Sequence, residues 1–201
     1  MDLHGFLRSR RSVRRFKPIP VEIEILKRIL ETATHAPSAH NRQPWRFAVI
    51  TAPQQKSRLA DLLAVDFQRD LAGDGLEAAE VEKHISRSKN RINQAPVIVI
   101  LCMDATEMDV YTDNLGNRAQ AERSMAVQSV AAAGLQLQLA AHAEGLSSVW
   151  TCSPLFATET VSLALDLPQT WEPQAMFFIG YGAEPPKERA HKELEEVVKF
   201  L

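Results

Sequence analysis

The first segment of this chain that could do chemistry is a cluster of arginines near the amino end. Four arginines and one hydroxyl lie within six residues, namely Arg10, Arg11, Ser12, Arg14 and Arg15. Guanidinium groups present a planar fork of donors that matches phosphate oxygens, and hydrogen bonds between these two oppositely charged groups are strong. The segment therefore predicts a phosphate site, although a solvated surface turn can have the same composition.

A second polar segment follows the first predicted helix and lies between two prolines. Pro37 and Pro44 enclose amide and hydroxyl side chains, which include Ser38, Asn41 and Gln43. A stiff loop with such donors and acceptors suits recognition of the edge of a flat heterocycle. Together with the arginine cluster, this loop suggests a nucleotide-like cofactor.

Small polar side chains also gather at the end of a predicted strand, at Thr151, Cys152 and Ser153. Strand ends are where cofactor edges meet backbone donors in α/β proteins. The same residues fit an ordinary helix start, with Ser153 as the N-cap and Pro154 at the first helical position. Both interpretations stay open at this point.

Other common chemistries find little support in the spacing. His35 and His40 have no Cys or Glu partners at metal-ligand spacing, so we expect no metal site. Ser38 lacks the strained turn that carries a hydrolase nucleophile. Gly180-Tyr181-Gly182 lacks the third glycine of a dinucleotide-binding motif, and no Walker lysine motif is present. A nucleotide phosphate would therefore have to be held by arginine side chains.

Length and composition narrow the class of protein. At 201 residues and 45% hydrophobic, the chain can bury one core, and we expect a single domain over residues 1–201. A net charge of -2 argues against a dedicated nucleic-acid binder. Two cysteines cannot form a disulfide framework, which favours a reduced compartment. The chain shows neither a membrane span nor a signal peptide, so we expect a cytoplasmic protein.

Periodicity and turn signals place the elements that would position these segments. Helices are predicted over 20–36, 54–71, 119–143 and 156–167, and the charged stretch 76–93 is predicted to be an exposed helix or flap. Strands are predicted over 47–50, 96–102, 147–151 and 175–180. Mingled helices and few strands indicate an α/β or α+β fold.

The predicted helix over 119–143 is apolar around almost its whole circumference. Such a helix needs cover on all sides, and in a small chain we expect some of that cover from a second subunit. The apolar residues of the tail, 194–201, would also dock on a neighbour.

In this order, the segments resemble the motifs of the nitroreductase family of FMN-dependent, homodimeric flavoenzymes. Later parts of the resemblance are Glu144-Gly145-Leu146, Trp171-Glu172-Pro173 and the tail from Lys192 to Val198. The resemblance covers nearly the whole chain. It implies an α+β fold, an α/β/α sandwich with a mostly antiparallel central sheet, and a C-terminal segment swapped onto the other subunit.

The resemblance also implies roles for individual residues. The FMN phosphate and ribityl chain would be held by Arg10, Arg11, Ser12 and Arg14. Ser38 and Asn41 would approach the flavin from the partner subunit, with Gln43 nearby. The ring near N5 and O4 would be lined by Thr151, Cys152 and Ser153. A basic tail residue, commonly arginine in the family, would complete the phosphate site; here that position is His191, and Arg189 or Lys192 could substitute.

By the same resemblance, the flavin would carry hydride from NADH or NADPH to a nitroaromatic compound, a quinone or a related acceptor in ping-pong turnover. No protein nucleophile or dedicated general base is expected, and the stretch 76–93 would influence acceptor choice. Three alternatives stay open. They are the reductase domain of the deazaflavin-cofactor glutamate ligase, a flavin-fragmenting synthase or dehalogenase, and a non-catalytic dimer that stores or senses FMN.

Overall fold

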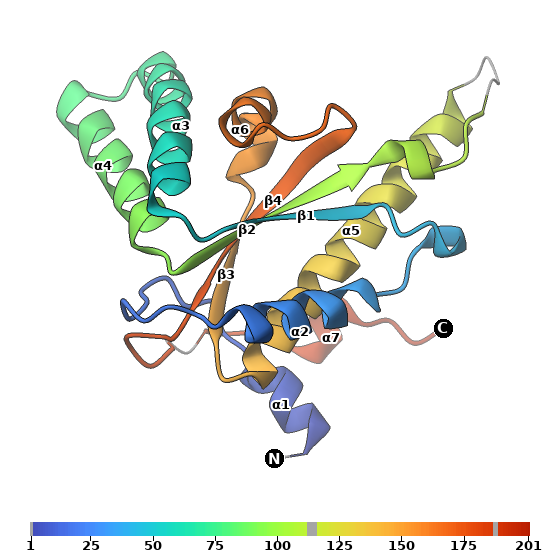
Figure 1. Ribbon diagram of the computed structural model, residues 1–201. Helices are drawn as coiled ribbons and strands as arrows, with labels where there is room; N and C mark the ends of the chain where they lie inside the picture. Colours follow the sequence, from blue (N-terminus) through green and yellow to red (C-terminus); the bar gives the residue numbers. More distant parts are fainter. Residues whose placement is uncertain (1, 112–115, 187–188) are drawn as a thin grey trace.

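An antiparallel sheet of four strands forms the centre of the computed structural model, which describes residues 2–111, 116–186 and 189–201 (Figure 1). The strands are β1 Trp45–Ile50, β2 Val97–Asp104, β3 Ser147–Thr151 and β4 Trp171–Gly180. Their order is β1-β2-β4-β3, and every neighbouring pair is antiparallel. The predicted α+β class with an antiparallel sheet is confirmed.

Strand β2 is buried along its full length, as its continuous apolar run predicts. Its side chains alternate between the two faces of the sheet. Val97, Val99 and Leu101 enter one hydrophobic cluster, whereas Ile98 and Ile100 enter the other. A strand with two buried faces requires helices on both sides.

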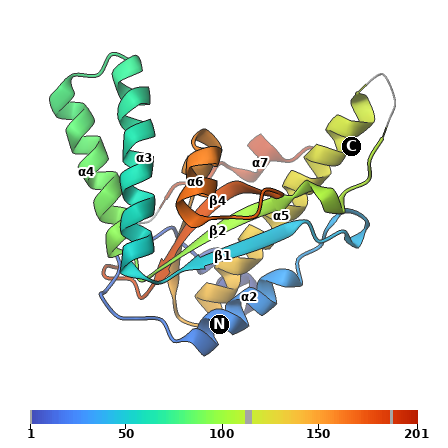
Figure 2. The same ribbon diagram turned by 45° about the horizontal axis from the view of Figure 1, so that its top comes forward.

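Helices cover both faces and complete the predicted sandwich. One face packs against α2 Ile23–Thr34 and the long α5 Asn117–Ala143, and the other packs against α3 Pro53–Gly73, α4 Ala78–Gln94 and α6 Thr158–Leu165. Helices α3 and α4 stand side by side at one end of the sheet (Figure 2). The short elements are α1 Leu3–Ser9, α7 Leu194–Val197 and the 3₁₀ turns η1 Ala39–Asn41, η2 Ala105–Glu107 and η3 Ser153–Phe156.

Helix α5 buries one side against the sheet and α2 and leaves apolar side chains open on the other. Ala133 and Leu137 are fully buried, while Leu135 is 50% exposed. Gly134 lies so close to the sheet that an added Cβ would be 2.9 Å from the Trp150 ring. None of the helices in the described ranges is long and apolar enough to cross a membrane.

The chain after β3 differs from the predicted helix start. A 3₁₀ turn occupies Ser153–Phe156 with Cys152 at its N-cap position, and α6 begins only at Thr158. The Pro154 carbonyl accepts the Ala157 N–H at 3.2 Å and the Thr158 hydroxyl at 3.1 Å, which closes the turn before the α-helix starts. The interpretation of Ser153 as the cap of one continuous helix is therefore wrong.

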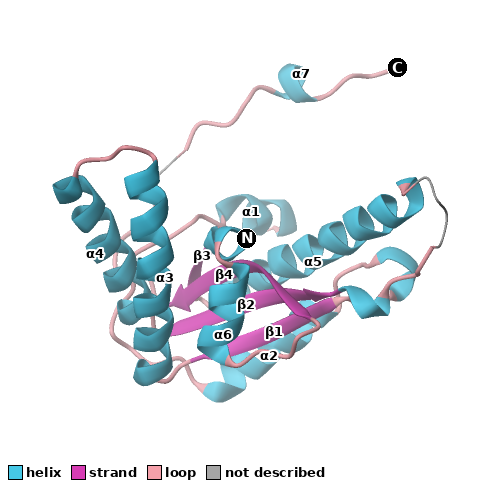
Figure 3. Cartoon of the chain, turned by 90° about the horizontal axis from the view of Figure 1, so that it is seen from above, coloured by secondary structure: helices cyan, strands magenta, loops and turns pink. Residues whose placement is uncertain are grey.

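The C-terminal segment, with α7, extends away from the sheet and its helices (Figure 3). Its apolar side chains are open, with Phe200 89% exposed and Val197 61% exposed. Exchange of this segment with a second subunit stays a prediction.

Candidate functional site

The arginine segment is fastened to the edge of the sheet. Ser12 bridges Ser148 of β3 in parallel, and the Val13 N–H donates to the Ser148 carbonyl at 3.0 Å. In extended backbone, successive side chains point to opposite sides of the chain. Val13 is accordingly buried in the core, which leaves Ser12 and Arg14 exposed on the other side.

These residues line a cavity of about 500 Å³. Its walls are formed by Arg10, Arg11, Ser12, Val13, Arg14, Arg15, Glu184, Pro185, Pro186, Arg189 and His191. Glu184 is the acid among these described lining residues, and its carboxylate already accepts from Arg15 at 2.7 Å. The cavity therefore keeps a strong excess of cationic donors, which suits an anion such as a phosphate.

The tail contributes two of its three candidate residues to this cavity. Arg189 and His191 line it, although they lie far from the arginine segment in the sequence. Lys192 is not among the residues that form the wall. The structure thus favours Arg189 and His191 over Lys192 as the tail's contribution to the cavity.

The second predicted segment forms a tight turn with an unusual backbone. His40, Asn41 and Gln43 have φ angles of 51°, 54° and 51°, in the left-handed region that ordinary residues seldom adopt. The Gln43 N–H donates to the Ser38 hydroxyl at 3.0 Å, and the Gln43 side-chain amide donates to Asn41 Oδ1 at 3.1 Å. The three predicted residues of this loop are therefore held together.

The loop and the arginine segment lie at opposite ends of the sheet (Figure 1). Trp45, next to the loop, pairs with Met103 near the end of β2. Ser148, next to the arginines, pairs with Ile179, which pairs with Val97 at the start of β2. Six residues of strand separate these ends, about 20 Å at 3.3 Å per residue. One chain by itself does not bring the arginine segment and the loop, the two predicted parts of the cofactor site, together.

The third predicted group lies at the end of β3. The Thr151 hydroxyl donates to the Met176 carbonyl at 3.0 Å, and Cys152 and Ser153 are exposed. Cys152 and Ser153 line a cavity of about 480 Å³ between α3, α4 and η3, with Met176 and Phe67 in its wall. Thr151 lies three residues along β3 from Ser148, about 10 Å. The group therefore lies on the same strand as the arginine anchor.

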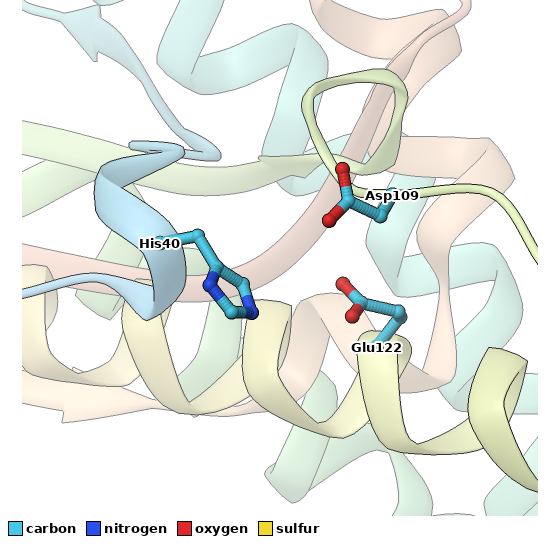
Figure 4. A group of neighbouring side chains, drawn as sticks. All are labelled: His40, Asp109 and Glu122. Carbon is cyan, nitrogen blue, oxygen red and sulfur yellow. The ribbon is translucent and has the colours of Figure 1, made fainter.

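One cluster was not predicted from the sequence. Side chains of His40, Asp109 and Glu122 converge from η1, from the chain after η2 and from α5 (Figure 4). Potential ligand atoms of the three lie within 4.8 Å of one another. Spacing along the chain could not indicate this cluster, because only the tertiary fold brings the three segments together.

Comparison with known proteins identifies the family. The family model described as the nitroreductase family matches residues 7–181. The chain belongs to the nitroreductase family. Membership confirms the resemblance seen in the sequence and places the chain among the flavin oxidoreductases.

Two curated relatives of this nitroreductase-family chain carry different activities in their names. It is 32% identical over 198 residues to the 5,6-dimethylbenzimidazole synthase of Rhodospirillum rubrum, which covers 97% of this chain and 87% of that protein. It is 30% identical over 212 aligned positions to the NADH dehydrogenase of Thermus thermophilus, with coverage of 94% and 91%.

Solved structures show the same nitroreductase fold. A BluB-like flavoprotein from Clostridium difficile superposes with a TM-score of 0.83 at 25% identity, covering 100% of this chain and 99% of that one. A nitroreductase-family protein from Desulfovibrio desulfuricans, in complex with FMN, gives a TM-score of 0.73 at 25% identity, with coverage of 98% and 95%.

Proposed function

We propose that this chain is an FMN-dependent oxidoreductase that takes hydride from NADH or NADPH and reduces an organic acceptor, such as a quinone or a nitroaromatic compound. The single observation that carries this proposal is the cationic cavity beside β3. It gathers residues from the two ends of the chain whose shared property is affinity for phosphate.

The residues in this cavity fit the phosphate end of FMN. Arg10, Arg11 and Arg14 offer charged forks, and Ser12 adds a neutral donor. The backbone of this segment is hydrogen-bonded to β3. FMN binding therefore does not have to order the segment, which avoids an entropic cost. FMN, when bound, supplies the hydride chemistry, and the protein supplies placement and electrostatics.

The ring would extend from this cavity along β3 toward Thr151, Cys152 and Ser153. The separation of about 10 Å between Ser148 and Thr151 suits a phosphate at one end and a ring at the other. The neighbouring apolar cavity between α3 and α4 would then receive the nicotinamide and the acceptor in turn. Helix α4 would influence acceptor choice, since its residues Ser88 and Ile92 line that cavity.

The enzyme would act as a homodimer with its sites at the interface. Ser38, Asn41 and Gln43 lie about 20 Å along the sheet from the arginine segment, so they would have to act on the flavin of the partner subunit. The open apolar side of α5 and the extended apolar tail would provide the contact area.

The test is anaerobic reduction of the purified protein. Bound flavin should give a yellow protein that NADH or NADPH bleaches, and a quinone or nitroarene should restore the colour. A bound flavin that neither nicotinamide reduces would refute the oxidoreductase and support an FMN store or sensor. A colourless protein that refuses added FMN would refute both.

A second candidate is a flavin-fragmenting synthase, which the similarity to the Rhodospirillum rubrum protein favours. The same preparation separates the two functions. After reduction, oxygen should restore the FMN spectrum in full if the chain is a reductase. Loss of the flavin with formation of dimethylbenzimidazole would establish the synthase instead.

A further inference from the structure

We propose that His40, Asp109 and Glu122 bind a divalent first-row transition metal ion, for which Zn²⁺ is the representative probe. The three side chains point toward one another (Figure 4), and one potential ligand atom from each lies within 4.8 Å of the others. One imidazole nitrogen and two carboxylate oxygens form a mixed donor set. Such a set suits zinc and its first-row neighbours, whereas calcium and magnesium prefer oxygen ligands alone.

Glu122 provides the observation that points to a ligand. The residue is only 5% exposed, and its Oε2 atom has no hydrogen-bond partner in the part of the chain that the structure describes. The Glu122 carboxylate, to which this atom belongs, faces His40 and Asp109 (Figure 4). A buried carboxylate oxygen without a donor is unfavourable, because the lost hydration is not replaced. A cation bound at this position would replace the lost hydration.

The fold holds the histidine-bearing turn against Glu122. The Ala39 N–H donates to the Ser129 hydroxyl at 3.1 Å. Ser129 lies seven residues after Glu122 on α5, which is two helical turns, so both residues face the same way. The turn is therefore fixed to the helix face that carries the buried carboxylate.

Asp109 is held at the cluster from another direction. Its Oδ1 atom accepts from the Arg42 guanidinium, and Arg42 directly follows η1. A carboxylate has two oxygens, so one can stay with Arg42 while the other binds a metal. The cluster is thus assembled by contacts that do not involve a metal, and this is the preorganisation that a binding site needs.

The geometry requires a modest contraction on binding. Zinc bonds of about 2.0–2.2 Å place tetrahedral ligand atoms roughly 3.4 Å apart, so two ligand atoms at the 4.8 Å limit must approach each other by about 1.4 Å. His40 is exposed and Asp109 is half-buried, so both can move toward the fixed Glu122. Three protein ligands would leave a fourth position for water.

The experiment measures Zn²⁺ binding to the full chain. A chelator first removes any bound metal, and the flavin content of the purified protein is left unchanged. Isothermal titration should show one site per chain. His40→Ala should weaken binding at least tenfold, and Glu122→Gln, which keeps the shape but removes the charge, should do the same. His35→Ala is the matched control, because it removes a nearby exposed histidine outside the cluster and should leave binding unchanged.

X-ray absorption of the zinc-loaded protein should show nitrogen and oxygen ligands without sulfur. The proposal is overturned if the wild-type chain takes up no zinc at micromolar concentration. It is also overturned if both variants bind as tightly as the wild type, or if sulfur appears in the spectrum. If Glu122→Gln does not fold, Asp109→Asn replaces it, since Asp109 lies nearer the surface. None of these readouts depends on flavin, so the oxidoreductase proposal is tested separately.

Discussion

The backbone N–H of Val13 donates to the carbonyl of Ser148 at 3.0 Å, and this bond attaches the arginine segment to strand β3. The Ser148 side chain is used as well. Its hydroxyl accepts the buried side-chain amide of Gln138 on α5 at 3.1 Å. One strand residue therefore connects the long helix to the cationic cavity.

Ser148→Ala should lower stability, because it leaves the buried Gln138 amide without its acceptor. The expected loss in the free energy of unfolding is about 1–3 kcal/mol. Urea denaturation measures it. Ser124→Ala is the control. Ser124 lies on the exposed side of α5, the helix that also carries Gln138, and its replacement should change stability by less than about 0.5 kcal/mol. Equal losses for the two variants would contradict the structural role of the buried pair.

Replacing Arg11 and Arg14 together by alanine should weaken FMN binding by about 3 kcal/mol or more, roughly a hundredfold, if both pair with the phosphate. Flavin fluorescence quenching measures the affinity. Arg58→Ala is the control, because Arg58 pairs with Asp166 at 2.9 Å outside the cavity. Unchanged affinity in the double variant would refute the placement of the phosphate.

A heterodimer tests whether each site is shared between subunits. One chain carries the double arginine change, and the other carries Asn41→Gly, which suits the φ angle of 54° at that position. In a shared arrangement, both defects fall in one site and the other site stays intact. The purified heterodimer should then bind one FMN with full affinity. Two weakened sites, with no tight one, would show that each site belongs to a single chain.

The two thiols should differ in reactivity. Burial raises the pKa of Cys102 to about 12, so its thiol stays protonated and inaccessible, whereas Cys152 is exposed. A disulfide reagent should modify one thiol per native chain and two after denaturation. Cys152→Ser should abolish the native reaction, and FMN should slow the reaction of the wild type. Equal rates with and without bound FMN would argue against placing the ring beside Cys152.

Gly134→Ala should destabilise the protein although alanine favours helices. The added Cβ would lie 2.9 Å from the Trp150 ring and 3.0 Å from both Leu101 and Phe177, where the core cannot yield freely. Overpacking of this kind costs about 1–3 kcal/mol. Gly73→Ala has no atom within 4 Å of the new Cβ and should be neutral or slightly stabilising. Thermal denaturation of both variants distinguishes packing from helix propensity.

Asp104 should make part of the stability depend on pH. Burial alone would raise its pKa, but the hydroxyl and N–H of Thr106, the hydroxyl of Thr170 and the Arg46 guanidinium outweigh burial and hold the pKa below its ordinary value. Stability from this group is therefore present above pH about 4 and is lost as the pH falls through the lowered pKa.

Thr170→Val removes one of these donors and should cost about 1 kcal/mol at pH 7, with the difference from the wild type shrinking below pH about 4. Urea denaturation across this range measures the effect. Thr158→Val is the control, because Thr158 donates to the Pro154 carbonyl and not to a carboxylate. A loss for Thr170→Val that stays the same at every pH would contradict the proposed link to Asp104.

Local patterns in the amino-acid sequence predicted the four strands and the long helices of this fold, but not the short helix α1. The apolar run around Ile98 and Ile100 predicted a strand buried on both faces, and apolar spacing predicted the long helices, because these signals arise from neighbours along the chain. The arginine cluster was also visible, since its members lie within six residues.

Only the tertiary structure decided which distant segments meet. Strand register places Ser12 beside Ser148 and places Trp45 at the far end of the sheet, and no local pattern encodes register between segments so far apart. The turn at Ser153–Phe156 replaced the expected helix cap because hydrogen bonds to the Pro154 carbonyl close the chain there. His40 reaches Glu122 because their segments pack together, and within the described part of the chain the buried Oε2 atom of Glu122 has no hydrogen-bond partner.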